Sequence, residues 1–264
     1  MTNSNERWAL ILGASSGFGG ATAIELARSG FDIFGLHLDR SVTLPNAERV
    51  QEEVRALGRQ AVFFNMNASD PDKMAAALDG MQEHLSNDAS VGMLLHSLAF
   101  GTLRPFVAES PGDVITPKQM DMTLEVMAHS LVYWTQAMVA RNMLRAGSKV
   151  FAMTSAGATR VWPTYGAVSA AKAALESHVR QLAYELAPRR VAVNAIRAGV
   201  TDTAALRKIP GHEDLLAGAG AHNPSGRTTT PEDVAKAIAA FSDERTAWMT
   251  GNVIGIDGGE DVVA

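Results

Sequence analysis

The chain has 264 residues, of which 47% are hydrophobic and 19% are charged. These values describe a globular protein, and the length suits one large α/β domain or two small ones. The formal net charge of −5 gives no reason to expect nucleic acid or an anionic membrane as a partner. Because the chain has no cysteine, disulfides, thiolate nucleophiles and cysteine metal sites are excluded.

The first residues, MTNSNERWAL, lack a basic start followed by an apolar core, so we expect no secretory signal. No apolar run reaches the ~18 residues of a membrane span. The longest candidate, VGMLLHSLAFGTL, contains His96 and two glycines. We interpret His96 as a buried structural histidine at a strand end, and we expect a soluble, cytoplasmic protein.

Short apolar runs that predict strands alternate with amphipathic segments that predict helices. This order indicates βαβ units, and hence a Rossmann-type, doubly wound, mostly parallel seven-stranded sheet with helices on both faces. No repeat or linker interrupts it, so residues 1–264 are interpreted as a single domain. The strand candidates are WALIL (8–12), DIFGLHL (32–38), AVFFNM (61–66), VGMLL (91–95), KVFAMT (149–154), VAVNAI (191–196) and NVIGID (252–257).

A glycine-rich segment follows the first strand directly. Gly13, Gly17 and Gly19 have the spacing G-x-x-x-G-x-G. Glycines in this pattern allow a tight turn and a close backbone approach to a pyrophosphate. The helix expected from about Gly19 offers its N–H groups to the phosphates, and Gly30 has the usual place of a C′ residue. The position between a strand and a helix predicts nucleotide binding.

The end of the second strand gives a mixed signal about the cofactor. An acid there would hold a free ribose hydroxyl, whereas a base would hold a 2′-phosphate. Asp39 is acidic, while His37 and Arg40 could meet a phosphate.

The segment YGAVSAAK places Tyr165 seven residues before Lys172. Pro163 and Thr164 make a good helix start, with Thr164 as the candidate cap. Seven residues along a helix return to nearly the same face, with an axial separation of ~10.5 Å. The two side chains are therefore expected to serve one extended ligand and not to pair directly.

The segment 197–230 breaks the alternation of strands and helices. It is rich in small residues and contains two prolines. An excursion of this length is usually a functional lid or binding loop, and the alternative is a disordered surface loop. We predict a substrate-binding excursion at about residues 199–226. The segment 104–122 has no predicted role beyond a loop near the substrate side.

Together, these motifs resemble the short-chain dehydrogenase/reductase family across nearly the whole chain. The matching segments are GASSGFG, YGAVSAAK, VNAIRAGVTDT and GNVIGIDGG. Main-branch members carry Tyr-x-x-x-Lys, but here Val168 stands four residues before the lysine. The Tyr-x6-Lys spacing and LLHSLAFG at 94–101 resemble the divergent branch, the enoyl-acyl-carrier-protein reductases. Ser155, seventeen residues before Lys172, instead resembles the serine of the main branch.

The resemblance implies roles for individual residues. Lys172 would hold the nicotinamide ribose, Tyr165 would hydrogen-bond to the developing thioester oxygen, and Ser155 would be a second donor. NADPH is the expected cofactor because NAD-using members carry an acid where this chain has His37, and Asp39 keeps NADH open. The cofactor-binding residues implied are Gly13, Ser15, Ser16, Gly17, Phe18, Gly19, His37, Arg40, Asn67, Ser97, Lys172, Gly199 and Thr203.

The leading functional hypothesis is reduction of the trans-2 double bond of enoyl thioesters in fatty-acid synthesis. The substrate would be an acyl thioester on acyl carrier protein or on coenzyme A. The resemblance also implies a homotetramer built through the long helices 117–145 and 163–187. A carbonyl or 3-ketoacyl reductase is the alternative, supported by Ser155. A non-catalytic NADP(H)-binding sensor is a further alternative, against which the intact Tyr165, Lys172 and Thr203 speak.

Overall fold

The computed structural model describes residues 7–86 and 89–263. Within them, seven strands form one sheet in the order β3-β2-β1-β4-β5-β6-β7, and every pairing is parallel. The expected doubly wound parallel sheet is confirmed, and each predicted run lies on a strand, with ends that differ by at most two residues. The strands are β1 (Arg7–Leu12), β2 (Phe31–His37), β3 (Ala61–Asn65), β4 (Ser90–His96), β5 (Lys149–Thr154), β6 (Ala192–Ala198) and β7 (Val253–Ile256).

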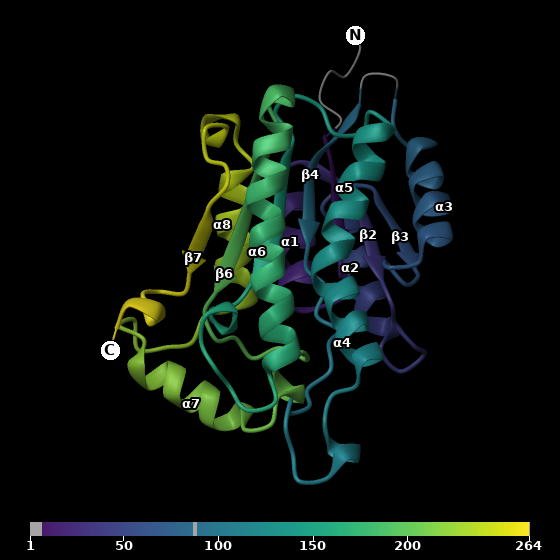
Figure 1. Cartoon of the computed structure of the whole chain (residues 1–264). Coiled ribbons are helices and arrows are strands. Elements are labelled where there is room, and N and C mark those ends of the chain that lie inside the picture. Colours follow the sequence, from purple (N-terminus) through teal and green to yellow (C-terminus); the bar gives the residue numbers. More distant parts are fainter. Residues whose placement is uncertain (1–6, 87–88, 264) are drawn as a thin grey trace.

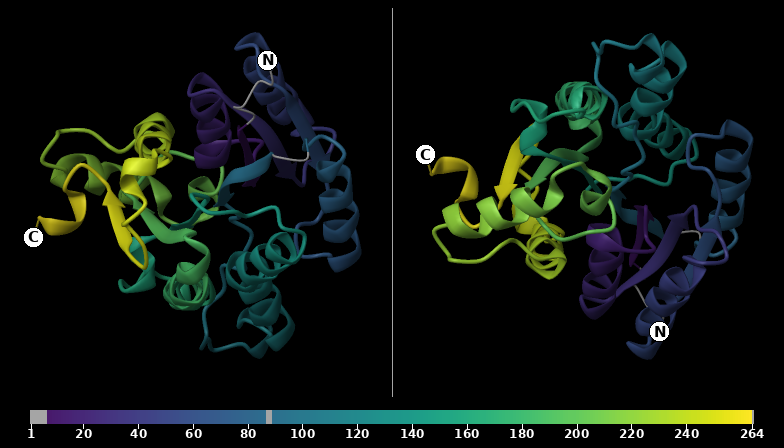
Figure 2. Two further views of the ribbon diagram at one scale, coloured as in Figure 1. Left: turned by 90° about the horizontal axis from the view of Figure 1, so that it is seen from above. Right: turned by 90° about the horizontal axis from the view of Figure 1, so that it is seen from below.

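Helices cover both faces of the sheet (Figure 2). One face carries α1 (Gly17–Arg28), α2 (Leu44–Ala56) and α8 (Pro231–Phe241); the other carries α3 (Pro71–Gln82), α4 (Pro117–Leu124), α5 (Ser130–Ala140) and α6 (Gly166–Leu186). Successive residues of β1 alternate between the two cores. Leu10 packs into the core beneath α5 and α6, and Ile11 packs into the core beneath α1 and α8. A strand buried on both faces has to be apolar throughout, which is why these runs were readable in the sequence.

Two helices differ from the lengths expected from the sequence. The segment 117–145 is α4, then a π-helical turn at Glu125–His129, then α5, which ends at Ala140. The segment 163–187 becomes helical only at Gly166. No helix among the described residues is long and apolar enough to cross a bilayer.

The strand order reverses between β1 and β4, and loops leaving neighbouring strands diverge at such a point. The loop after β1 is held by a hydrogen bond from the Gly13 N–H to the Leu36 carbonyl (2.8 Å), and the loop after β4 by one from the Ser97 N–H to the Leu12 carbonyl (2.9 Å). The carboxyl ends of the strands, where ligands of such sheets bind, lie toward the lower end of Figure 1. There α7 (His212–His222) lies outside the two helical layers.

Candidate active site

The loop after β1 requires glycine for two physical reasons. Gly13 and Gly17 have φ angles of +93° and +55°, which favour glycine. At Gly19 a Cβ atom would lie 2.0 Å from the Gly13 carbonyl oxygen, so no side chain fits there. Ser16, the N-cap of α1, makes no side-chain cap bond. The first turn of α1 therefore presents N–H groups to an anionic ligand, which fits a pyrophosphate.

Thr203 lies opposite this loop although it is distant in the sequence. A Cβ atom at Gly17 would be 3.7 Å from the Thr203 Cγ2 atom. The Thr203 hydroxyl oxygen accepts a bond from the Leu206 N–H (3.2 Å), which fixes its direction. Gly199, at the base of the same segment, has no room for a side chain, because a Cβ there would lie 2.3 Å from the Thr229 Oγ1 atom. The structure thus brings the predicted Gly17 and Thr203 together.

Four further predicted cofactor residues lie in or beside this loop. Phe18 packs its ring on the core beneath α1. Ser97 approaches the loop from β4, since its carbonyl oxygen would be 2.5 Å from a Cβ at Gly13. Ser16 is the N-cap of α1, and Ser15 hydrogen-bonds to Asp39.

The end of β2 holds a histidine–carboxylate pair. The Nδ1 atom of His37 lies 2.9 Å from the Oδ2 atom of Asp39, and the His37 side chain is only 3% exposed. Burial acts to raise the pKa of Asp39, but hydrogen bonds from Thr43, Ser15 and His37 outweigh it and hold that pKa below its ordinary value. Asp39 is therefore an ionised carboxylate joined to the glycine loop, while Arg40 is exposed.

Asn67 is exposed, and its side chain turns back on its own loop, where Oδ1 accepts a bond from the Ser69 N–H (3.0 Å). Asn65, which sequence reasoning missed, joins the ends of β2 and β3. Its Oδ1 accepts from the Asp39 N–H (3.1 Å) and its Nδ2 donates to the Asp39 carbonyl (2.9 Å). The only feature of the sequence that pointed to Asn65 was its place two residues before the predicted Asn67.

Ser155 and Tyr165 meet beyond the end of β5. The Ser155 Oγ atom accepts a bond from the Gly157 N–H (3.1 Å), and a Cβ at Gly157 would lie 2.5 Å from Cε1 of Tyr165. The tyrosine ring therefore lies flush against this turn. Burial raises the pKa of Tyr165, and a hydrogen bond with Ser155 acts against that rise. The phenol thus remains protonated at neutral pH and can donate a hydrogen bond.

Lys172 extends from α6 to the end of β5. Its side chain is buried, and Nζ donates to the Met153 carbonyl at 2.7 Å. Burial lowers its pKa from 10.5 to about 8, and the charge of Glu176 opposes that fall. At neutral pH Lys172 is therefore still a cation, with one donor used and two free.

Thr164 is not the helix cap that the sequence suggested. Tyr165 is the N-cap of α6, and Thr164 has a φ angle of +64°. Its buried Oγ1 atom has no hydrogen-bond partner among the described residues. A β-branched residue in the left-handed region is strained, and such strain is found where a neighbouring side chain must be aimed. Here that neighbour is Tyr165.

The position four residues before Lys172 holds no hydroxyl group. Val168 is 5% exposed, and a Cβ at Gly101 would lie 2.8 Å from its Cγ2 atom. The valine thus fills apolar space between α6 and the loop after β4, so no phenol stands one helical turn before Lys172.

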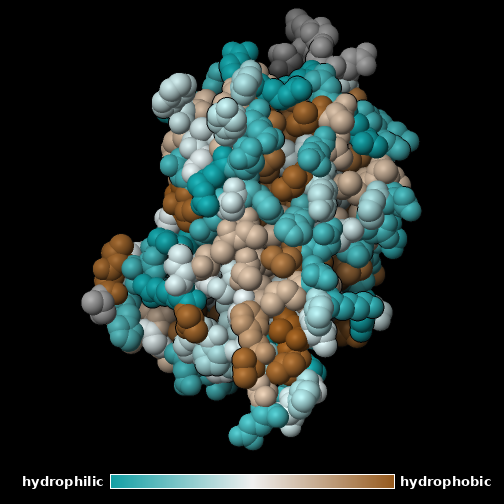
Figure 3. Space-filling view, viewed as in Figure 1, coloured by the Kyte–Doolittle hydropathy of each residue, from teal (hydrophilic) through white to brown (hydrophobic). Residues whose placement is uncertain are grey.

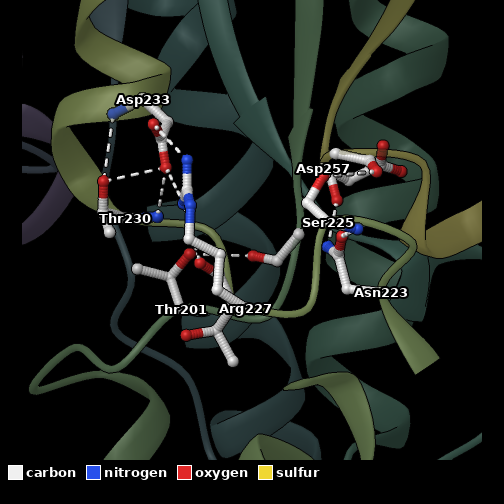
Figure 4. Close-up of polar contacts among 10 residues, drawn as sticks. Thr201, Asn223, Ser225, Arg227, Thr230, Asp233 and Asp257 are labelled. Atoms are coloured by element: carbon white, nitrogen blue, oxygen red, sulfur yellow. Dashed lines mark hydrogen bonds and ion pairs between the residues drawn. The ribbon is translucent and has the colours of Figure 1, made fainter. Parts of the chain in front are cut away.

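The excursion that was expected after β6 is ordered, so the disordered alternative is wrong. It contains the 3-10 turn Leu206–Lys208 and α7. Its return to α8 is fixed by polar contacts, including Asn223 Nδ2 to the Asp257 carbonyl (2.7 Å) and an ion pair between Arg227 and Asp233 (2.6 Å) (Figure 4). Trp162, three residues before Tyr165, donates from Nε1 to the Pro210 carbonyl (3.2 Å). The excursion therefore touches the segment that carries the tyrosine.

Sequence reasoning also missed the C-terminal turn Glu260–Val262. The Glu260 carboxylate accepts a bond from the Val200 N–H (3.0 Å). The Asp261 carboxylate bridges Arg160 (2.8 Å) and Arg197 (2.9 Å). This turn joins three strand ends around the site, and no local pattern marks its residues in the sequence.

The comparisons with known proteins agree with this geometry. The profile of the family described as Enoyl-(Acyl carrier protein) reductase matches residues 13–260. The chain belongs to the short-chain dehydrogenase/reductase family. Its sequence is 30% identical over 262 residues to a 3-oxoacyl-acyl-carrier-protein reductase of Pseudomonas aeruginosa, covering 95% of this chain and 96% of that protein. As a family member, it is an oxidoreductase with a Rossmann-type fold.

A second relative performs a different reduction. The enoyl-acyl-carrier-protein reductase (NADH) of Salmonella typhimurium is 31% identical over 225 residues, which cover 82% of this chain and 80% of that protein. Among solved structures, a 3-oxoacyl-acyl-carrier-protein reductase from Brucella melitensis in complex with NAD superposes with a TM-score of 0.82 at 24% identity, covering 98% of this chain and 99% of that one. Keto and enoyl reductases are thus similar to this chain to the same degree, and the distinction depends on the site itself.

Proposed function

We propose that the chain is an NADPH-dependent reductase of the trans-2 double bond of enoyl thioesters, acting as one domain. The observation that carries this proposal is the position of Tyr165. It lies at the start of α6 with its ring on Gly157, while the place four residues before Lys172 holds a buried valine. A ketone reductase of the main branch would need its phenol at the place of Val168.

The residues described above fit a nicotinamide dinucleotide. The uncapped first turn of α1 and the close-packed glycines would hold its pyrophosphate, and Thr203 would lie beside the nicotinamide. Lys172 would donate its two free N–H groups to the ribose hydroxyls. When bound, the cofactor supplies a hydride.

Reduction of an enoyl thioester places negative charge on the thioester oxygen. A protonated Tyr165 would donate a hydrogen bond to that oxygen, and the charge of Lys172 would stabilise the enolate. The Ser155 hydroxyl, already oriented by the Gly157 N–H, would be a second donor. The α-carbon then takes a proton, for which solvent is a sufficient source.

Apolar side chains border this end of the molecule. Val107 is 86% exposed and Val161 96%, and Phe106 lies against Gly166, at the start of α6. Apolar residues gather at the lower end of the face in Figure 3. Exposed apolar surface of this kind suits an acyl chain, which the excursion at 199–226 would cover.

The second candidate is a 3-ketoacyl reductase. Ser155 favours it, because this serine lies beside the phenol and could polarise a ketone. For the cofactor, the ionised Asp39 favours NADH and the exposed Arg40 favours NADPH. We propose NADPH because no acid stands at position 37.

The experiment is an absorbance assay of cofactor oxidation. Purified protein is mixed with NADPH or NADH and either a medium-chain trans-2-enoyl thioester or the matching 3-ketoacyl thioester, each on coenzyme A and on acyl carrier protein. We expect oxidation of NADPH with the enoyl substrate. Oxidation only with the keto substrate would replace the proposal by the second candidate. Binding of NADPH without turnover of either would mean that the substrate lies outside acyl thioesters.

Tyr165→Phe tests the chemistry, with Tyr184→Phe as the matched control. Tyr184 is on the same helix but is 79% exposed. The first variant should lose turnover and keep NADPH binding, and the second should keep both turnover and NADPH binding. Full activity of Tyr165→Phe would refute the proposed role. The homotetramer and the cytoplasmic location stay predictions, which size-exclusion chromatography with light scattering and cell fractionation would test.

A further inference from the structure

Lys172 is a cation enclosed by protein. Only 5% of it is exposed, and its ammonium group donates a hydrogen bond to the Met153 carbonyl at 2.7 Å, its one such partner among the described residues. Enclosing a charge in this way favours its neutral form unless another charge compensates. The proposed work of Lys172 on the ribose and the enolate requires the charged form. The surroundings must therefore supply negative potential.

Glu176 lies one helical turn after Lys172 on α6. Its Oε1 atom accepts a hydrogen bond from the Thr154 Oγ1 atom at 2.7 Å. Thr154 is the last residue of β5 and follows directly after Met153. The end of one strand thus fixes both side chains, the lysine through a backbone carbonyl and the glutamate through a hydroxyl. The carboxylate is partly buried, so its charge is only partly screened by water.

The other titratable groups near Lys172 carry no compensating charge. On β4, the fully buried His96 has a pKa of about 3 because of burial and the nearby Lys172, so it is neutral. On α6, burial raises the pKa of Tyr165, so it is also neutral. From β5 the contacting groups, Met153 carbonyl and Thr154, have no charge. Among the described residues that interact with Lys172, Glu176 therefore supplies the negative charge.

We propose that Glu176, held in place by Thr154, is a positioning residue that keeps Lys172 in its charged, cofactor-binding form. This inference depends on the cofactor-binding role proposed above for Lys172. No ion pair within 4.0 Å joins the two side chains among the described residues, so Glu176 acts through its field and leaves the free ammonium donors to the ribose. A direct ion pair would occupy one of those donors.

The pKa of Lys172, lowered by burial to about 8 and held up by Glu176, makes the proposal measurable. Below this pH Lys172 is charged, which cofactor binding requires. Binding should therefore weaken as the pH rises through this value. Glu176→Gln keeps the shape and a hydrogen bond to Thr154 but removes the charge. The weakening should then begin at a lower pH, by about one unit for the loss of one nearby opposite charge.

The test is the dissociation constant of NADPH, measured by its fluorescence from pH 6 to 9.5. For Glu176→Gln we expect binding like the wild type at pH 6 and about fivefold weaker at pH 8, since the charged fraction falls from about one half to about one tenth. Glu176→Asp should restore most of the profile. Thr154→Val, which frees the carboxylate without removing it, should give a smaller shift in the same direction and serves if Glu176→Gln does not fold.

Glu185→Gln is the matched control, because Glu185 is exposed near the far end of α6. It should follow the wild-type profile. Lys172→Met separates the two proposals. If Lys172→Met binds NADPH with the wild-type pH profile, the role proposed for Lys172 is wrong. If Lys172→Met loses binding but Glu176→Gln follows the wild type at every pH, the role proposed for Glu176 is overturned.

Discussion

The Nε2 atom of His96 lies 2.8 Å from the Oγ atom of Ser130, and both residues are buried. The Ser130 hydroxyl donates to the Val126 carbonyl (2.8 Å), so Nε2 must donate to Ser130. Val126 belongs to the π-helical turn Glu125–His129, which interrupts the helical segment just before Ser130. The Nδ1 atom of His96 has no partner among the described residues. This histidine is thus locked in its neutral form at the carboxyl end of β4.

We predict that His96 limits stability in acid. Its folded-state pKa is about 3, whereas an unfolded histidine has a pKa of 6.5. Between these values the unfolded chain binds a proton that the folded chain does not, so stability is lost as the pH falls below about 6.5. The free energy of unfolding should fall by about 2 kcal/mol from this residue alone between pH 7 and pH 5.

Urea unfolding at pH 7 and pH 5 measures this loss. His96→Gln, which can keep a donor toward Ser130, should show a smaller fall between the two pH values. Comparing the change with pH, and not the absolute stability, removes any packing cost of the substitution. Equal falls in the wild type and the variant would contradict the prediction.

Much of the fold was readable because its physical causes are local. The central strands β1, β2 and β5 are buried on both faces and so form apolar runs. The spacing of the glycines likewise predicts the loop after β1. Gly30 ends α1 with a φ angle of +90°, as its place after the helix predicted. Gly17 and Thr203 were each assigned to the cofactor, the first from the glycine spacing and the second from the family resemblance, and the structure places them side by side.

Other features depend on tertiary register and could not be predicted. Glu176 reaches Thr154 only because of how α6 lies along β5, which no spacing in the sequence reveals. The π-helical turn before Ser130 has no sequence signature. The left-handed conformation of Thr164 also contradicts its own propensity, and no local pattern in the sequence predicts it.

Gly157 should be essential for activity although it has no functional group. A Cβ atom there would lie 2.5 Å from Cε1 of Tyr165, and its backbone φ is not in the left-handed region, so Gly157→Ala acts by displacing the ring. Displacing a catalytic group by about 1 Å can lower turnover by about 100-fold. We expect a fall of at least about tenfold in kcat with unchanged NADPH binding.

Steady-state kinetics and NADPH titration would check this. Gly218→Ala is the control, because a Cβ at that position in α7 meets nothing within 4 Å. It should leave kcat unchanged. A Gly157→Ala enzyme with wild-type kcat would show that the position of the tyrosine ring is not critical.

A substitution at Arg40 tests the choice of cofactor with less effect on stability than one at His37. The sequence suggested that His37→Asp would shift preference toward NADH, and that remains the expected direction. In the structure, however, the new carboxylate would be buried beside Asp39, which costs stability. Arg40 is exposed, so Arg40→Ala should fold normally. Loss of a charged hydrogen bond to a 2′-phosphate should raise the KM for NADPH about tenfold and leave that for NADH unchanged.

Parallel assays with NADPH and NADH give the ratio of kcat/KM for the two cofactors directly. Asp39→Asn is the complementary variant, since removing an anion near a 2′-phosphate should strengthen NADPH binding. If Arg40→Ala leaves the NADPH to NADH ratio unaltered, Arg40 does not contact the 2′-phosphate, and the choice of NADPH depends on position 37 alone.

Trp162 should control binding of the acyl substrate without affecting the cofactor. Its indole N–H bond to the Pro210 carbonyl, at 3.2 Å, links the segment before Tyr165 to the excursion. A Cβ at Gly211 would lie 3.6 Å from its ring, so the indole also packs on the excursion beside Pro210. Trp162→Phe removes the hydrogen bond and keeps most of the aromatic surface. Since a neutral hydrogen bond contributes about 1 kcal/mol, the KM for the enoyl thioester should rise about fivefold, with kcat and the Kd for NADPH nearly unchanged.

Trp248→Phe is the matched control, because Trp248 is 97% exposed and lies near β7, away from the excursion. It should leave all three constants unchanged. A rise in the Kd for NADPH equal to the rise in KM would mean that Trp162 supports the cofactor and not the acyl chain. An unchanged KM would mean that the excursion holds its position without this bond, and that its other contacts, such as Asn223 with the Asp257 carbonyl, suffice to close the site.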